Sequence, residues 1–222
     1  AINNELSFMI NNKEFKGEFK EAKLISTHRK LPAKKILLAG LGKEKDFTSE
    51  KLRRISATTA KALRNTGIKS FSTTLHSANI KGSNTREKAQ IVGEGITLGL
   101  YDFKKYITVD KDKIKKIDSV VILELEKKNT ESVSAGVRKG VLLSENVTRV
   151  RDLINEPAEL ITPTYLANEA KKIAKESNGS IKVKIFGKAE IEKMGMGGLS
   201  GVSKGSAQEP KFIILDYNSK KK

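Results

Sequence analysis

The chain has 222 residues, enough for one large or two small domains with a core that needs no disulfide or metal. It has no cysteine, which excludes a disulfide framework, a thiolate metal site and a cysteine nucleophile and suits a reducing compartment. Its 43 Lys and Arg against 26 Asp and Glu give a net charge of +17, which adds nucleic acid or an acidic partner to the candidates.

No apolar run approaches the roughly 18 residues needed to span a bilayer. The first ten residues also lack the basic-then-apolar layout of a signal peptide. We therefore expect a cytoplasmic protein with no membrane partner.

Strands alternate with helices from the start of the chain, which predicts an α/β fold. We expect strands over 5–10 and 34–42, the second with an apolar run from Ile36 to Leu41 that fits a strand covered on both faces. A helix follows, with Thr48 or Ser49 as N-cap and its end at Gly67. Its apolar stripe consists of Leu52, Ile55, Thr59 and Leu63.

The same helix carries five basic residues mostly off this stripe, and they are the candidates for a nucleic-acid contact: Lys51, Arg53, Arg54, Lys61 and Arg64. Across the whole chain, however, the basic residues are mostly Lys spread singly rather than clustered with aromatic residues. This distribution favours a solvated surface over a nucleic-acid interface, which usually concentrates on one face.

The middle of the chain continues the alternation. A short strand is expected over 71–75, then a helix over 84–106 that opens with a capping box of Asn84 and Glu87, and a strand over 118–126. The apolar positions of this helix are Ala89, Val92, Ile96, Gly99 and Phe103. Its glycines indicate close packing against a neighbouring element.

A long helix over 130–155 is predicted next, and it ends before Pro157. One side of it carries Val133, Val137, Val141, Ser144, Val147 and Arg151. A further helix has Thr162 as N-cap, Pro163 at its first position and Gly179 past its end.

The last part of the chain predicts a strand over 181–187, a short helix over 188–195, a glycine-rich loop over 194–206 and a strand over 211–217. Only two strands are predicted in this part of the chain, so we expect a second domain that is incomplete. The loop is no dinucleotide motif, because Ser200 stands at the third glycine position and the loop runs from a helix toward a strand. The segment 40–51 likewise lacks the Walker spacing.

Catalytic and metal-binding patterns are absent from the sequence. The two histidines, His28 and His76, lie far apart and have no ligand partner at helical spacing. Ser206 has no neighbouring acid-base partner and no nucleophile elbow around it. From the residues alone we therefore assign no catalytic, cofactor-binding or metal residue.

Two stretches carry a resemblance to a known family. The segments 151–174 and 194–217 resemble the opening of the catalytic domain of the leucine aminopeptidase family of cytosolic metalloexopeptidases. The first fits its R-D-L-x-N-x-P pattern and following T-P at Arg151, Asp152, Leu153, Asn155, Pro157, Thr162 and Pro163. The second fits its glycine-rich segment at Met196, Gly197, Gly198, Leu199, Val202, Gly205, Ser206 and Pro210. Segments 36–54 and 94–106 resemble landmarks of its N-terminal domain.

The resemblance implies a domain organisation and a function. Residues 1–135 would be a macro-like α/β domain with a mixed sheet flanked by helices, 136–154 a connecting helix, and 155–222 the incomplete start of the catalytic domain. Full-length members are hydrolases that remove N-terminal residues from peptides with two divalent ions, zinc or manganese, and they are typically cytoplasmic hexamers.

The sequence also departs from the family pattern. Glu159 stands where the family commonly has Asn, and the stretches V-G-K-G-x-T-F-D-S-G-G and N-T-D-A-E-G-R, which carry the metal ligands and the catalytic Lys and Arg, are absent from this chain. They would follow the strand over 211–217. No catalytic or metal residue is therefore carried over, and we expect the chain alone to bind no metal and to be inactive.

Two other functions stay open. The positive charge, together with the DNA binding of some members of this family, gives a basic nucleic-acid-binding module as the main alternative. Likeness to macro folds gives a binder of ADP-ribose or a nucleotide, which is an inference from the fold alone. The glycine-rich segment we interpret as backbone scaffolding that turns the chain tightly toward the last strand without contacting substrate.

Overall fold

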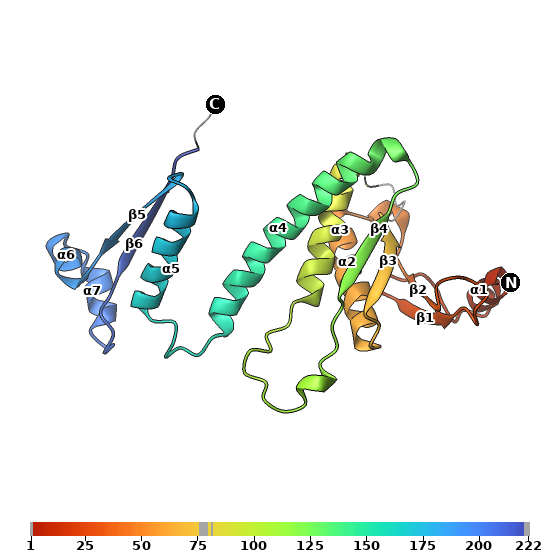
Figure 1. Cartoon of the computed structure of the whole chain (residues 1–222), viewed down its shortest axis with the longest axis horizontal. Helices are drawn as coiled ribbons and strands as arrows, with labels where there is room; N and C mark the ends of the chain where they lie inside the picture. The colour runs from red at the N-terminus through yellow and green to blue at the C-terminus, as the bar shows by residue number, and fades with distance from the viewer. Residues whose placement is uncertain (1, 76–79, 81, 220–222) are drawn as a thin grey trace. The chain divides into compact units, whose positions relative to one another are not determined.

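The computed structural model of the chain describes residues 2–75, 80 and 82–219 (Figure 1). By its internal contacts the chain divides into two units, residues 1–151 and 152–222. Both units mix helices with strands, so the predicted α/β class is confirmed.

The first unit contains α1 (Ile2–Asn11), β1 (Ala22–Ser26), β2 (Lys35–Ala39), α2 (Ser49–Asn65), β3 (Ser70–Thr74), α3 (Thr85–Leu100), β4 (Ser119–Leu123) and all but the end of α4 (Thr130–Asn155). The second unit contains α5 (Pro163–Glu176), β5 (Ile181–Phe186), α6 (Lys188–Lys193), α7 (Gly197–Ser203) and β6 (Phe212–Tyr217). Single 3-10 turns over Glu44–Asp46, Lys111–Lys113 and Lys127–Asn129 precede α2, β4 and α4.

The first unit holds one antiparallel and one parallel pair of strands. β1 and β2 form an antiparallel hairpin, while β3 and β4 run parallel in the register Ser70↔Ser119. Within the described residues β2 pairs only with β1. The prediction that Ile36–Leu41 is covered on both faces is therefore wrong: β2 is half-buried, because it lies at the edge of a two-stranded sheet.

The prediction of a strand over 5–10 is also wrong, because these residues belong to helix α1. Met9 is buried and Leu6 is half-buried, whereas Phe8 and Ile10 are exposed. Burial therefore recurs every three residues, which is the period of a helix rather than the period of two that defines a strand.

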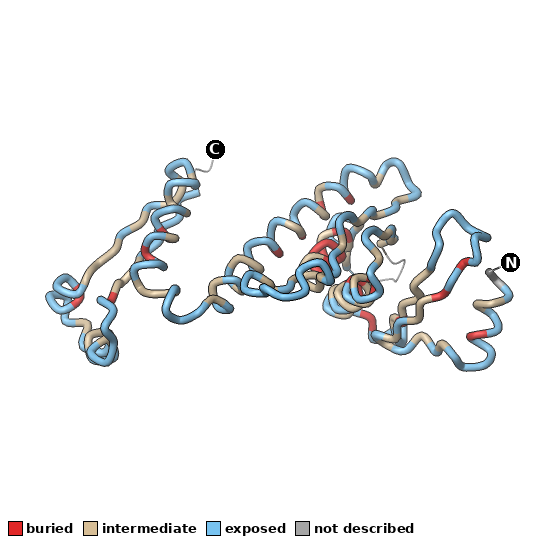
Figure 2. Tube along the Cα trace, turned by 60° about the horizontal axis from the view of Figure 1, so that its bottom comes forward, coloured by how far each residue is buried: buried red, intermediate tan, exposed pale blue. Residues whose placement is uncertain are grey.

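The core of the first unit forms where α2 and α3 pack together with the inner face of β3 and β4. Its buried residues are Phe47, Leu52, Ile55, Ala60, Ile80, Ile91, Val92 and Ile96, and Phe71, Val120 and Ile122 pack against them. Figure 2 shows this buried centre in the first unit. On the predicted α2 stripe Leu52, Ile55 and Leu63 are buried, which confirms the predicted face of the helix.

The predicted helix starts are confirmed. The Thr48 hydroxyl accepts a hydrogen bond from the Lys51 amide at 3.3 Å. Asn84 and Glu87 form the reciprocal capping box, with distances of 2.9 and 3.1 Å. The predicted end of this helix at 106 is wrong, because α3 ends at Leu100, where the backbone of Tyr101 becomes extended.

Glycines bring α3 into backbone contact with both neighbouring helices. A Cβ added at Gly95 or Gly99 would meet the α2 backbone, and one added at Gly136 or Gly140 of α4 would meet the α3 backbone. The close packing predicted from the glycines of α3 is therefore confirmed.

The predicted face of α4 is confirmed as far as Ser144, because Val133 and Ser144 are buried together with Gly136 and Gly140. Val147, predicted to lie on the inner side, is 42 % exposed. The helix turns its small residues toward α3, because only they permit the close approach.

The second unit has an antiparallel pair of strands, β5 and β6, with α5 packed against them and with α6 and α7 in the connection between them. The rings of Phe186 and Phe212 stack across the two strands with centroids 5.9 Å apart. The hydroxyl of Thr162 caps α5 by accepting a hydrogen bond from the Tyr165 amide at 3.2 Å, and Gly179 adopts φ +85° after its end, as predicted. The buried residues of this unit among the described residues are Ala167, Ala170, Ile191 and Pro210.

We predict that Gly140→Ala destabilises the first unit by about 2 kcal/mol or more, because its methyl group would collide with the backbone of Gln90. Gly93→Ala is the matched control at the same contact between α3 and α4, since its Cβ would lie 3.4 Å from the Val137 carbonyl oxygen. That change should alter stability by about 1 kcal/mol at most. Urea unfolding of both variants measures the difference, and equal effects would contradict the packing argument.

Candidate functional site

The glycine-rich segment 194–206 contains a tight turn followed by a short helix. Gly195 ends α6 with φ +67°, and the amides of Gly195 and Met196 donate to the carbonyls of Glu192 and Ile191, as in a Schellman motif. This turn leads into α7 rather than into the last strand, toward which the sequence predicted it. The prediction of a loop throughout is wrong, because Gly197–Ser203 forms α7.

The three glycines of α7 have open space where a side chain would lie. A Cβ added at Gly197, Gly198 or Gly201 would meet no atom within 4 Å, and Val202 is 84 % exposed. With helical dihedrals and open space around them, these glycines do not form a phosphate cradle.

The chain leaves this segment through an anchored turn before β6. The carboxylate of Glu209 accepts a hydrogen bond from the Lys211 amine and a longer one, at 3.4 Å, from the Lys188 amide at the start of α6. These hydrogen bonds, that from Lys211 foremost, lower the pKa of the Glu209 carboxyl group. The contact holds the start of β6 against the start of α6.

The glycines of segment 40–51 allow its backbone to pack closely against residues 17 and 18. A Cβ on Gly40 would collide with the backbone of Gly17 and Glu18, and the Gly42 amide donates to the Gly17 carbonyl at 2.9 Å. The place that a phosphate would occupy in a phosphate-binding loop is taken by the chain itself.

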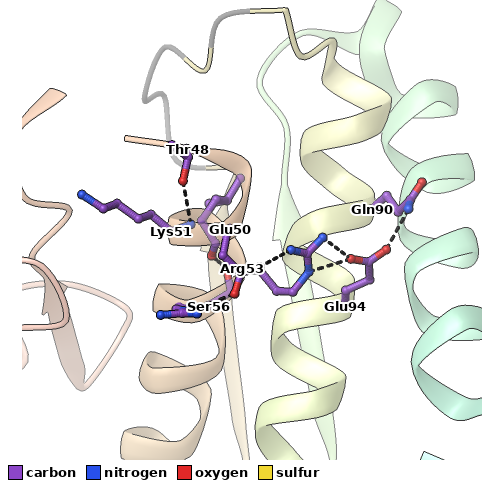
Figure 3. Close-up of polar contacts among 9 residues, drawn as sticks. Thr48, Glu50, Lys51, Arg53, Ser56, Gln90 and Glu94 are labelled. Atoms are coloured by element: carbon purple, nitrogen blue, oxygen red, sulfur yellow. Dashed lines mark hydrogen bonds and ion pairs between the residues drawn. The ribbon is translucent and has the colours of Figure 1, made fainter. Parts of the chain in front are cut away.

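A polar cluster joins α2 to α3 (Figure 3). The Nε of Arg53 donates to a carboxylate oxygen of Glu94 at 2.8 Å, and the Gln90 amide donates to the other oxygen at 2.7 Å. Arg53 also pairs with Glu50, one turn earlier in α2. The Glu94 side chain is only 11 % exposed, so the guanidinium supplies the charge that a buried carboxylate requires.

The candidate nucleic-acid residues of α2 are placed in different surroundings. Arg53 and Arg54 pair with Glu50, and Arg64 pairs with Asp102 at 3.5 Å. The amine of Lys51 lies over the Phe19 ring at 5.3 Å, and Lys61 is exposed. The acidic partners offset much of the positive charge, and the assignment of these five residues stays a prediction, which the salt dependence of DNA binding would test.

A groove of about 790 Å³ runs along the free edge of β4, between α3 and α4. Its apolar lining includes Ile96, Leu100, Val120, Val133, Val137 and Val141. Its charged residues are Asp118, Glu124 and Arg138. Two carboxylates with a single guanidinium do not favour a diphosphate ligand, and binding of ADP-ribose stays a prediction that calorimetry would test.

The described residues contain no group of three or more His, Asp or Glu side chains that could hold a metal ion. His28 lies exposed in the turn after β1, and His76 lies outside the described residues. No helix in the described part of the chain is long and apolar enough to cross a membrane.

The R-D-L-x-N-x-P pattern at the end of α4 has a structural explanation in part. The Arg151 guanidinium lies 5.5 Å from the ring centroid of Tyr101, the residue that follows α3. Pro157 begins a turn in which its carbonyl accepts from the Leu160 amide at 2.9 Å, and this turn leads to the Thr162 cap of α5.

Family comparisons identify both parts of the chain. Residues 1–109 match the model of the cytosol aminopeptidase family, N-terminal domain, and residues 148–222 match that of the cytosol aminopeptidase family, catalytic domain. A probable cytosol aminopeptidase of Alkaliphilus metalliredigens is 35 % identical over 95 % of this chain and 42 % of its own length. The cytosol aminopeptidase of Pseudomonas aeruginosa is 28 % identical over 100 % of this chain and 44 % of its own length.

Solved structures share the fold. A mutant of tomato leucine aminopeptidase matches 100 % of this chain with a TM-score of 0.82 at 23 % identity. The bottromycin maturation enzyme BotP, in complex with manganese, matches 96 % with a TM-score of 0.77 at 22 % identity. The chain covers 42 % of each of these two proteins, and at such identities the likeness concerns the fold.

We predict that Glu94→Ala lowers the free energy of unfolding by about 1–3 kcal/mol, because it leaves the half-buried Arg53 without its inner partner. Glu50→Gln is the control on the same network, and it should cost less than about 1 kcal/mol because Glu50 is half exposed. Denaturant unfolding of both variants gives the two values, and a larger loss for Glu50→Gln would contradict this order.

The contribution of Glu50 to the free energy of unfolding depends on pH. Hydrogen bonds from Arg54 and Arg53 lower the pKa of the Glu50 carboxyl group below its ordinary value. Its small contribution to stability is therefore present above the pKa of the unfolded chain, and it is lost as the pH falls through the lower pKa of the folded state. The difference between wild type and Glu50→Gln should shrink in acid, and a difference that grows in acid would refute the assignment.

Proposed function

Because the chain belongs to the cytosol aminopeptidase family, we propose that it forms the N-terminal domain and the start of the catalytic domain of an aminopeptidase. That enzyme removes N-terminal residues from peptides. The observation that carries this proposal is the match of two domain models of one family in consecutive order, residues 1–109 and 148–222. The chain spans less than half the length of the curated relatives it matches.

The proposal includes two divalent ions, zinc or manganese, which activate the water that attacks the peptide bond. The manganese complex of BotP supports this class of metal. The described residues of this chain do not fit such a centre, because they contain no cluster of three potential ligands. We therefore assign them no step of the hydrolysis.

The role that we propose for residues 155–222 is to position the end of β6. The Thr162 cap fixes the chain before β5, and the turn at Gly195 and the contact of Glu209 with Lys211 fix it between β5 and β6. In the family pattern the metal-binding stretch follows this last strand. A fixed β6 would thus set where that stretch begins.

We also propose the domain boundaries implied by the resemblance: an N-terminal macro-like domain over 1–135, a connecting helix over 136–154 and the catalytic domain from 155. A hexameric assembly and a cytoplasmic location belong to the same proposal. Sedimentation of the complete enzyme would measure the assembly.

We predict that a polypeptide extending through both absent motif stretches hydrolyses leucine p-nitroanilide with added manganese or zinc and loses this activity in EDTA. The present 222 residues should show no hydrolysis under the same conditions, because they contain neither stretch. Hydrolysis by the 222-residue chain, or none by the longer polypeptide with either metal, would overturn the proposal.

A further inference from the structure

We propose that Asn178, in the turn between α5 and β5, is a site of spontaneous deamidation in the folded protein (Figure 1). Its isoaspartate product releases the start of β5 from the end of α5. The modification lies in the second unit and does not depend on aminopeptidase activity.

The sequence around Asn178 favours the reaction. In deamidation, the backbone nitrogen of the residue after an asparagine attacks the side-chain carbonyl carbon, and a side chain on that following residue hinders the attack. Glycine has no Cβ and rotates freely about its backbone bonds, so it removes this hindrance. Asn178–Gly179 is the only Asn-Gly pair in the 222 residues.

The structure leaves both reacting groups accessible. Asn178 and Gly179 are exposed, and their φ values are +50° and +85°. Among the described residues, no acceptor binds the Gly179 amide and no partner binds the Asn178 side chain. The attacking nitrogen therefore needs to break no hydrogen bond to the protein before it turns toward the Asn178 side chain.

Two other asparagines of the second unit are held differently. Asn168 is exposed in the middle of α5, where the helix holds the amide of the next residue, Glu169. Asn155 ends α4, and the amide of the following Glu156 donates to the Asp152 carbonyl at 3.0 Å. At both positions the attack would first break a backbone hydrogen bond, so they serve as internal controls.

The reaction balances with water as its only co-reactant. The Gly179 nitrogen forms a bond to Cγ of Asn178, the bond from Cγ to Nδ2 breaks, and the proton from the Gly179 nitrogen leaves with Nδ2 as ammonia. The product is a cyclic succinimide. Water opens this ring at either carbonyl and gives aspartate or isoaspartate. In isoaspartate the main chain runs through Cβ and Cγ, so the turn gains an extra backbone carbon.

The turn is closed by hydrogen bonds that fit its present length. The Ser180 amide donates to the Ser177 carbonyl at 3.1 Å, and the amide of Ile181, the first residue of β5, donates to the Ser177 hydroxyl at 2.8 Å. The same hydroxyl donates to the Ala174 carbonyl of α5 at 2.7 Å, so it ties the strand to the helix. An extra backbone carbon between Ser177 and Ser180 disrupts these contacts. The new carboxylate also follows the C-terminus of α5, where the helix dipole disfavours negative charge.

The first test follows deamidation in the complete polypeptide encoded by the gene, kept folded in warm neutral buffer. Trypsin releases residues 176–182, which contain Asn178, and residues 152–171, which contain Asn155 and Asn168. By mass spectrometry we expect the first peptide to convert from amide to acid at least about tenfold faster than the second, because glycine leaves the attack unhindered. A sample digested before incubation gives the background. Equal rates in the two peptides, or conversion of Asn178 only in urea, would overturn the proposal.

A matched pair of variants assigns the modified residue. Asn178→Gly removes the side-chain amide and suits the positive φ of this position, whereas Asn168→Gln changes an exposed asparagine of α5. After incubation we expect an isoaspartyl methyltransferase with S-adenosylmethionine to label the wild type and Asn168→Gln equally and Asn178→Gly much less. Labelling of the folded Asn178→Gly variant at the level of the wild type would overturn the assignment.

Hydrogen exchange tests the release of β5. Asn178→Asp adds the carboxylate without the extra backbone carbon, so it is the control for charge alone. We expect the amides at the start of β5 to exchange at least about tenfold faster in the isoaspartyl form than in Asn178→Asp, while the protection of α6 stays unchanged. Equal exchange in the two forms would overturn the proposed release.

Discussion

Backbone contact of α3 with both α2 and α4 is the constraint on which the first unit depends. At Gly95 and Gly99 the α2 backbone lies where a Cβ would be, and at Gly136 and Gly140 the α3 backbone does. This close approach sets the positions of α2 and α4 on either side of α3. It also leaves the larger side chains of α4, Val137 and Val141 among them, to line the groove beside β4.

The polar cluster lies at the same contact and is made necessary by it. Glu94 stands between Gly93 and Gly95 on α3, so close helix packing buries its carboxylate, and Arg53 and Gln90 satisfy the two oxygens. Desolvation of the charge is thereby offset by a partner from α2 and another from α3 itself. As a result, Arg53, which the sequence places among the basic surface residues of α2, points to the contact with α3 and adds little positive charge to the surface.

Local signals in the sequence were sufficient wherever the cause is local. Thr48, Thr162 and the Asn84–Glu87 pair predict helix starts because a cap acts within three residues. The prediction of a strand over 5–10 was wrong because the sequence does not show which of its apolar residues are buried, and only the burial of Leu6 and Met9 indicates a helical period. Helix α7 was missed because glycine has low helix propensity, and no residue pattern of Gly197–Ser203 compensates for it. The family could be predicted from motifs whose order and spacing match it. Catalytic residues could not be predicted, because the stretches that carry them in the family are absent from these 222 residues.

Each sheet among the described residues has only two strands, and much of the apolar surface around the sheet of the second unit is exposed. In the second unit the buried apolar side chains among the described residues are two alanines, Ile191 and Pro210, while Leu215 and Tyr217 of β6 are 47 % and 68 % exposed. Two-stranded sheets are marginal in water unless further strands or helices cover them. Leu215 and Tyr217 therefore present apolar surface that the described residues do not cover. In the aminopeptidase proposed above, the stretch that follows β6 would cover this surface, so the packing of β6 would be coupled to the position of that stretch.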